Sequence, residues 1–119
     1  MRRILIPITG DDIAPRFDQA LEVLITEMNE GGGPGPEKTI ILNRASGEAL
    51  CNLILTQNIS VVVCCGIEEE HYEYLKWKGV EVFDSVAGPY SAALRRLADG
   101  RLCCGDVLLE RKIDGYVFE

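Results

Sequence analysis

The pattern of apolar residues changes part-way along the chain, and this change constrains the fold more than any other feature. Three strand-like runs, residues 4–8, 21–28 and 38–43, follow one another in the first part. Later segments with helical periodicity alternate with short apolar runs, so the later strands must be joined by parallel crossovers. The sequence therefore predicts an α/β fold with a mixed five-stranded sheet, in the order β-β-β-α-β-α-β-α, whose second strand is antiparallel to the rest.

Capping residues place three helices in the second half of the chain. Ser46 can cap a helix that runs to about residue 57, and Pro89 opens a last helix that closes near residue 100. The middle helix carries three glutamates, at 68–70, in its first turn, which suits the helix dipole. The run at residues 59–65 is almost continuously apolar, which is typical of a strand covered on both faces, and residues 80–83 are expected to form the next strand. Helices are therefore expected on both faces of the sheet.

Composition limits the class of protein. The 119 residues carry a net charge of −7, which argues against non-specific binding to nucleic acid, because such binding depends on a basic surface. No apolar run reaches the ~20 residues that span a bilayer, and the run after Arg2 and Arg3 is too short for a signal peptide. We therefore expect a cytoplasmic protein with no membrane contact.

The five cysteines are many for a chain of this length. Four of them form adjacent pairs, Cys64 with Cys65 and Cys103 with Cys104, and an odd count in adjacent pairs is a poor disulfide framework. In a reducing compartment cysteines are more often buried apolar residues, metal ligands or redox groups. Cys51 lies within an amphipathic helical segment, where we expect it in the core.

Two segments fall outside the regular pattern. The linker at residues 31–36 consists of glycine and proline alone and is expected to be a mobile hairpin tip. It lacks the Gly-Lys-Ser/Thr and the helix that a phosphate loop needs. Residues 1–102 form the predicted α/β domain. Residues 103–119 form a C-terminal extension, either a small hairpin around an Asp-Gly turn or a disordered tail.

The loop at residues 10–18 is too elaborate for a simple turn, and its centre is Pro15-Arg16-Phe17. Further along, the run at 61–67 ends in a Gly-Ile pair, and residues 79–82 read Gly-Val-Glu-Val. In this order and spacing the motifs resemble the dinitrogenase iron-molybdenum cofactor biosynthesis domain family, over about residues 2–102. The resemblance implies a ribonuclease-H-like α/β fold and, from the better-understood members, binding of iron-sulfur-type cluster precursors.

Ligands of open α/β sheets bind outside the carboxyl ends of the strands. Three segments are expected to converge there: residues 10–18, 64–67 and 84–88. We expect ligand contacts from Arg16 and Asp12 in the loop, and from Gly66 and Gly88 in the two turns.

Cys65 and His71 are the candidate metal ligands, because thiolate and imidazole suit iron. Adjacent side chains on a strand point to opposite faces, so only one of Cys64 and Cys65 faces the cleft easily, and we favour Cys65. The alternative is that both cysteines are buried apolar residues and that His71 is a surface or half-buried side chain. The sequence has no Cys-x-x-Cys spacing, so any cluster would be held loosely, as in a carrier.

The charged residues of the loop also allow two interpretations each. Arg16 can bind an anionic ligand through its planar, always charged guanidinium, or it can pair with Asp12 or Asp18 and hold the loop in shape. Asp11, Asp12 and Asp18 can bind a divalent cation through oxygen, or they can remain solvated. The glutamates at 68–70 would repel an anionic cluster from a helix N-terminus that is normally a good anion site.

These observations favour a small cytoplasmic protein that binds and delivers a metallocluster without catalytic turnover. The cargo would be an iron-sulfur or iron-molybdenum cofactor precursor, the partner a protein that donates or accepts it, and the chain a monomer or homodimer. The alternative is a metal-free protein-interaction or regulatory domain. A redox enzyme is less favoured, because Cys64 and Cys65 would form only a strained ring. A two-metal nuclease is not favoured, because the first strand, residues 3–8, and the run at residues 60–65 carry no acidic residue.

Overall fold

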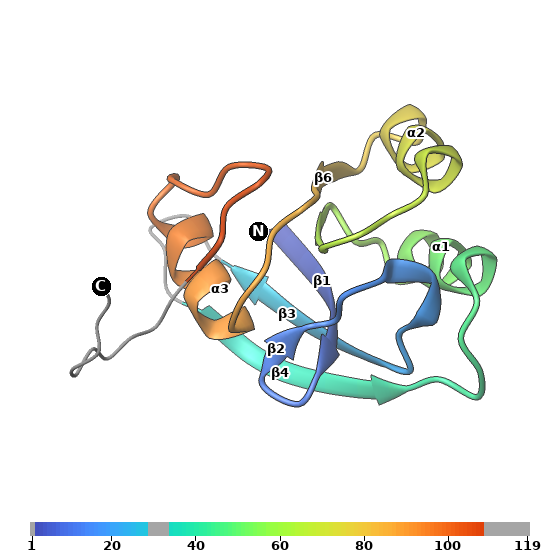
Figure 1. The fold of residues 1–119 in the computed structure, drawn as a ribbon, viewed down its shortest axis with the longest axis horizontal. Coiled ribbons are helices and arrows are strands. Elements are labelled where there is room, and N and C mark those ends of the chain that lie inside the picture. The colour runs from blue at the N-terminus through green and yellow to red at the C-terminus, as the bar shows by residue number, and fades with distance from the viewer. Residues whose placement is uncertain (1, 29–33, 109–119) are drawn as a thin grey trace.

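A mixed six-stranded sheet lies between helices on both of its faces (Figure 1). The structure is a computed structural model that describes residues 2–28 and 34–108. Its strands are β1 (Arg2–Thr9), β2 (Asp12–Ile13), β3 (Glu22–Met28), β4 (Pro34–Ile41), β5 (Val61–Val63) and β6 (Glu81–Phe83). Their order across the sheet is β4-β3-β1-β5-β6, and β2 pairs with β1 outside this path.

The helical elements are η1 (Phe17–Gln19), a short 3-10 helix, and the α-helices α1 (Gly47–Thr56), α2 (Glu69–Trp77) and α3 (Tyr90–Ala98). The Ser46 hydroxyl accepts a hydrogen bond from the Ala49 backbone N–H at 3.1 Å, which confirms the predicted cap of α1. Gly79 and Gly100 follow α2 and α3 with φ of +87° and +72°, a conformation that glycine adopts without steric cost. In the described parts of the chain, no helix is long and apolar enough to cross a membrane.

The strand directions agree with the prediction, but the sheet has one strand more than expected. β3 is antiparallel to β1 and β4, and β5 is parallel to β1 and β6. The additional strand, β2, is two residues long and pairs antiparallel with the end of β1. The mixed α/β sheet is thus confirmed, and the expected number of strands is corrected, because a two-residue strand leaves no periodic pattern to detect.

β4 begins earlier than the sequence predicts, within the segment of glycine and proline. Oγ1 of Thr26 on β3 lies 3.3 Å from the Gly35 carbonyl oxygen and 3.1 Å from that of Pro36. This contact helps to hold the start of β4 against β3. The prediction of a mobile linker is therefore wrong for residues 34–36, and the rest of that linker, residues 31–33, lies outside the described residues.

Alternating side chains of the strands divide the core between the two faces of the sheet. Ile4, Ile6 and Ile8 of β1 join a buried cluster with α3, whereas Leu5 joins a second cluster with α1 and α2. Figure 1 shows α3 on one side of the strands and the other two helices on the opposite side. We call these sides the α3 face and the α1–α2 face.

The chain beyond α3 returns to the sheet and packs on the α3 face. Leu102 and Leu108 are buried in the cluster of that face. The Ala87 N–H donates to the Asp106 carbonyl at 3.0 Å, and the Leu108 N–H donates to the Ala87 carbonyl at 2.8 Å. Residues 103–108, the first part of the predicted extension, are thus bonded to the turn after β6. The hairpin considered for the rest of the extension lies outside the described residues.

Candidate functional site

Three segments meet at the edge of the sheet where β1, β5 and β6 end, as their order predicts. The Phe17 N–H donates to the Gly66 carbonyl at 2.7 Å, and the Gly66 N–H donates to the Pro15 carbonyl at 2.9 Å. The Ile13 N–H donates to the Gly88 carbonyl at 2.9 Å. Backbone hydrogen bonds therefore join the loop at residues 10–18 to the turns that follow β5 and β6.

Two of the predicted ligand contacts, Gly66 and Gly88, also have a packing role. A Cβ on Gly66 would lie 3.0 Å from the Pro15 carbonyl oxygen. Gly88 has a φ of +123°, and a Cβ there would overlap the carbonyl oxygen of Leu108. Close approach of backbone segments accounts for both glycines, whether or not a ligand also contacts them.

Arg16 is paired with two acidic side chains. Its Nε lies 3.2 Å from Oδ1 of Asp18, and its Nη2 lies 3.9 Å from Oε2 of Glu68. The pair with Asp18 is one of the two arrangements that the sequence allows. Half of the Arg16 side chain is exposed, so these ion pairs contribute little to stability. The predicted ligand contact Asp12 is also exposed, on β2.

The two candidate metal ligands lie over opposite faces of the sheet. Cys65 packs against the cluster of the α3 face, whereas Cys64 is fully buried on the α1–α2 face, so the adjacent cysteines point apart as predicted. His71, on α2, contacts Cys51 and Phe17, which belong to the α1–α2 face. The structure therefore does not bring Cys65 and His71 together, and it places a different thiol beside the histidine.

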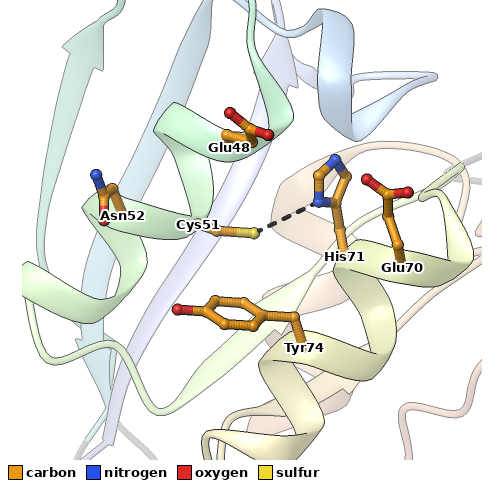
Figure 2. Close-up of a pocket in the computed structure, with 6 residues that line it drawn as sticks. All are labelled: Glu48, Cys51, Asn52, Glu70, His71 and Tyr74. Carbon is orange, nitrogen blue, oxygen red and sulfur yellow. Dashed lines mark hydrogen bonds between the residues drawn. The ribbon is translucent and has the colours of Figure 1, made fainter.

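The imidazole of His71 has a partner on each side. Its Nδ1 lies 3.9 Å from Sγ of Cys51 (Figure 2). Its Nε2 lies 3.6 Å from Oε1 of Glu68. The Phe17 ring packs at a tilt, with its centroid 5.9 Å from that of the imidazole. His71 is only 9% exposed, so it is more deeply buried than the alternative interpretation of the sequence assumed. These contacts fix the orientation of the ring.

Gly47 makes room for this imidazole in the first turn of α1. A Cβ at this position would overlap Nε2 of His71 and would lie 2.7 Å from its Cδ2. In a helix, alanine is normally more favourable than glycine by about 1 kcal/mol. The close approach of α1 to the histidine ring is therefore the physical reason for a glycine here.

Two hollows flank His71 between α1 and α2, and we call them together the α1–α2 groove. One has a volume of about 360 Å³ and is lined by Glu48, Cys51, Asn52, Glu70, His71 and Tyr74 (Figure 2). The other has a volume of about 470 Å³ and is lined by Asp18, Arg44, Ala45, Ser46, Gly47, Glu48, Glu68, Glu70 and His71. Glu48, Glu70 and His71 line both hollows, so the imidazole stands between them.

The α1–α2 groove is acidic. The larger hollow is lined by four carboxylates and by one guanidinium, that of Arg44. A concave surface lined by one sign of charge raises the local concentration of ions of the opposite sign. With imidazole nitrogen and carboxylate oxygen as donors, the groove is suited to a metal cation rather than to an anion.

The two buried thiols of this face are poor nucleophiles. Burial, with a smaller contribution from Glu48, raises the pKa of the Cys51 thiol to about 11. Burial also raises the pKa of the Cys64 thiol. Both groups are therefore neutral at pH 7, whereas reaction requires a thiolate. This arrangement does not favour a redox enzyme based on Cys64 and Cys65. Cys103 and Cys104 are exposed in the turn after α3.

Sequence comparison now places the chain among known proteins. The family described as dinitrogenase iron-molybdenum cofactor matches residues 1–100. The chain belongs to this family. The resemblance carried by Pro15-Arg16-Phe17 and the later motifs is thus confirmed, and the dinitrogenase iron-molybdenum cofactor family marks the chain as a small cofactor-related protein. The comparison with curated proteins gives no match.

Solved structures share the fold of this family member. The crystal structure of PH0822 superposes with a TM-score of 0.78 at 19% identity, covering 86% of this chain and 93% of the other. A candidate dinitrogenase from Methanocaldococcus jannaschii gives 0.70 at 20% identity, covering 84% and 90%. The apo form of the orange protein from Desulfovibrio gigas gives 0.68 at 17% identity, covering 87% and 92%. At such low identity these likenesses establish the fold alone, and they confirm the type of fold that the family resemblance implied.

Sequence reasoning misses Cys51 and Glu48 as neighbours of His71. Cys51 lies in the apolar stripe of α1, which is the usual place of a core residue, and it is separated from His71 by 20 positions. A usable signal was the spacing of Glu68 and His71, because residues three apart share one face of a helix. The contact of α1 with α2 depends on tertiary packing, and no local spacing reveals it.

Proposed function

We propose that this protein is a small, non-catalytic carrier that binds an iron-containing cluster or its precursor and passes it to a partner protein. The family supports a role connected with a metal cofactor. The observation that carries the proposal is the environment of His71, a buried imidazole between a thiol and a carboxylate, flanked by two hollows. Nitrogen, sulfur and oxygen donors in one place suit iron.

The cargo would be anchored by His71 and bordered by the loop at residues 10–18. Arg16 already reaches Glu68 beside the groove and can contact an anionic group of the cargo. Asp12, together with the backbone at Gly66 and Gly88, borders the same edge of the sheet. Few of these contacts are covalent ligands, and a loosely held cargo is what transfer between proteins requires.

Cys65 enters the proposal as a separate ligand. It is partly buried against the α3-face cluster, on the other side of the sheet from His71, and it directly precedes Gly66. A cargo that reaches Cys65 must therefore approach the turn after β5 from the α3 face. Substitution of Cys65 and substitution of His71 are then expected to have separable effects on loading.

The charge of the groove limits the kind of cargo. Its carboxylates outnumber its cationic side chains, so an anionic cluster is repelled while iron ions and less anionic precursors are attracted. We propose that the cargo is such a precursor, that its donor or acceptor is another protein, and that the chain works as a monomer or homodimer in the cytoplasm.

Anaerobic reconstitution with iron and sulfide tests the carrier. The wild-type chain is expected to bind iron and to gain charge-transfer absorption, and His71→Ala to lose most of the bound iron. Cys65→Ser should lose part of it, and Cys103→Ser, at an exposed cysteine outside the groove, serves as the matched control. A wild-type chain that stays colourless and free of iron would rule out the carrier.

The alternative is an interaction domain without metal, and one surface feature favours it. Trp77 on α2 is 77% exposed, beside the half-exposed Tyr74. Large aromatic side chains are enriched at interfaces. If reconstitution fails while Trp77→Ala abolishes capture of a specific partner, the interaction domain replaces the carrier.

A further inference from the structure

We infer that Glu68, Glu70 and His71 form a binding site for a single divalent transition-metal ion of the Fe²⁺ or Zn²⁺ class. One ligand atom from each of these side chains can be chosen so that all lie within 4.8 Å of one another. An ion with bonds of about 2.0–2.2 Å to nitrogen and oxygen draws its ligand atoms to roughly 3–4 Å apart. Rotation of the two exposed glutamate side chains is enough to close this difference.

The sequence spacing supports the same set of ligands. Glu68 directly precedes the first turn of α2, three residues before His71, and its Oε1 lies 3.6 Å from Nε2 of His71. Glu-x-x-His is the spacing by which helices of carboxylate-bridged metal proteins present their ligands. Glu70 adds a second carboxylate from the same turn.

The histidine is independently prepared for the role. When Nε2 binds an ion, Nδ1 carries the ring proton and can donate it to Sγ of Cys51, which lies 3.9 Å away. A second partner of this kind orients a metal-binding histidine and selects its tautomer. Packing against Phe17 and burial of the ring reduce the entropy that binding would otherwise cost. Gly47 keeps the space next to Nε2 free of a side chain.

The surroundings leave room and charge for an ion. The larger hollow, of about 470 Å³, can hold the waters that complete the coordination of the ion. Asp18 and Glu48 in the same lining add negative charge. Arg16 competes for Glu68 from 3.9 Å, but both side chains are half exposed, so this ion pair is easily exchanged for a metal bond.

This inference deepens the proposed function, and it rests on that function for taking the α1–α2 groove as the place where cargo is received. It names a single aqueous ion as the first cargo, bound before any sulfide. Zn²⁺ and Fe²⁺ both accept imidazole and carboxylate ligands, so the site is defined by its class of ion.

Calorimetric titration of the full chain with Zn²⁺, and anaerobically with Fe²⁺, tests the site in the absence of sulfide. The wild type is expected to bind one ion per chain. Glu68→Gln and Glu70→Gln keep the shape of the side chains and are each expected to weaken binding at least about tenfold, the loss of one charged ligand. Glu73→Gln removes the same charge from an exposed position on the same helix and should change affinity less than about twofold.

The carboxylate variants carry the test, because replacement of the buried His71 also removes its packing against Phe17 and Cys51. The absorption spectrum of bound Co²⁺ provides a second measurement, and its ligand-field bands should change in Glu70→Gln and stay unchanged in Glu73→Gln. Absence of ion binding by the wild type, or an equal loss in Glu73→Gln, would overturn the site.

The result separates this inference from the carrier. If the wild type loads iron with sulfide but binds no single ion, the ion site is wrong and the carrier stands. If it binds one ion but never forms a cluster, the ion site stands and cluster carriage is wrong.

Discussion

The α3 face and the α1–α2 face are built on the same strands, but in the described part of the chain only the α1–α2 face places an imidazole beside its hollows. The hollows next to α3 are lined by Glu37, Asp99 and arginines. On the α3 face, Leu94 and Leu97 of α3 meet Leu102 and Leu108 from the chain that follows. On the α1–α2 face, the apolar base next to the sheet is just as continuous. Above it, however, His71 and the carboxylates of the groove lie between the two helices.

The difference between the two faces explains how this fold produces a candidate site. The single helix α3 and the segment that follows it bury an apolar cluster against their face, and the hollows beside them contain no histidine. Two helices side by side leave a seam between them, and side chains in the seam are buried on one side and open on the other. A histidine in such a position keeps a fixed orientation and still reaches a hollow. A side chain that binds a metal ion requires both properties.

Disrupting the apolar cluster of the α3 face should have the largest effect on stability and none on metal binding. Leu97→Ala removes a side chain that is 5% exposed and is expected to lower the free energy of unfolding by about 2–4 kcal/mol. Urea denaturation measures the loss, and Ser91→Ala on the exposed side of α3 is the control. Loss of ion binding in a folded Leu97→Ala chain would show that the two faces are not independent.

A side chain in the space next to His71 should destabilise the packing of α1 against α2 at the α1–α2 groove. Gly47→Ala is expected to cost about 1–2 kcal/mol, because its Cβ overlaps His71 Nε2, and to reduce ion binding. In a His71→Ala background the same substitution should instead stabilise α1 by about 0.5–1 kcal/mol. A double-mutant cycle by urea denaturation measures this reversal. An equal effect in both backgrounds would mean that the histidine is not what requires glycine.

Replacement of Arg16, which competes with a metal ion for Glu68, should strengthen ion binding in the α1–α2 groove with little change in stability. Arg16→Gln is expected to change the free energy of unfolding by less than about 1 kcal/mol, since its ion pairs are exposed. It should increase the affinity for Zn²⁺ severalfold by releasing Glu68. Lys38→Gln, on the exposed side of β4, is the control for net charge. Weaker Zn²⁺ binding would indicate that Arg16 holds the site together rather than competing with the ion.

Cysteine labelling should measure how accessible the thiols on each face are, with no substitution in either face. With iodoacetamide at pH 8, Cys103 is expected to react first, because it is exposed. Cys104 is also exposed but should react more slowly, because partial burial of its thiol raises the pKa. Cys51 and Cys64 should stay unmodified until the chain unfolds, because burial raises the pKa of both thiols. Labelling of Cys51 in the folded chain should increase as the pH rises toward 11. Mass spectrometry of peptides gives the order, and rapid labelling of Cys51 at pH 8 would contradict its burial.

Much of the fold could be predicted because its signals are local. Ser46 and the glycines after α2 and α3 act within a few residues, and the change from strand pairs to alternating elements fixes the directions of the strands. β2 could not be predicted, since two residues carry no period. The start of β4 could not be predicted either, because its glycine and prolines oppose a strand and contacts from Thr26 help to hold it.

The sequence predicted that the two adjacent cysteines point to opposite faces of the sheet, but it did not predict which face His71 lies on. Alternation on a strand indicates that Cys64 and Cys65 point apart, and the structure agrees. The face that α2 covers depends on the handedness of the connections between the parallel strands. The prediction from the sequence therefore paired His71 with Cys65, which lies on the other face. The neighbour that the structure provides, Cys51, comes from another helix and is visible only after α1 and α2 pack.

The bonds of Ala87 also determine which parts of the chain must open together. Its N–H and its carbonyl are both held by the segment that follows α3, at Asp106 and Leu108. Its amide proton can therefore exchange with deuterium only when that segment lifts from the turn after β6. The family similarity ends at residue 100, but the cooperative unit seen by amide exchange should extend to Leu108. Truncation of the chain after residue 100 would remove both partners of Ala87 and would expose the turn after β6, where the three segments meet.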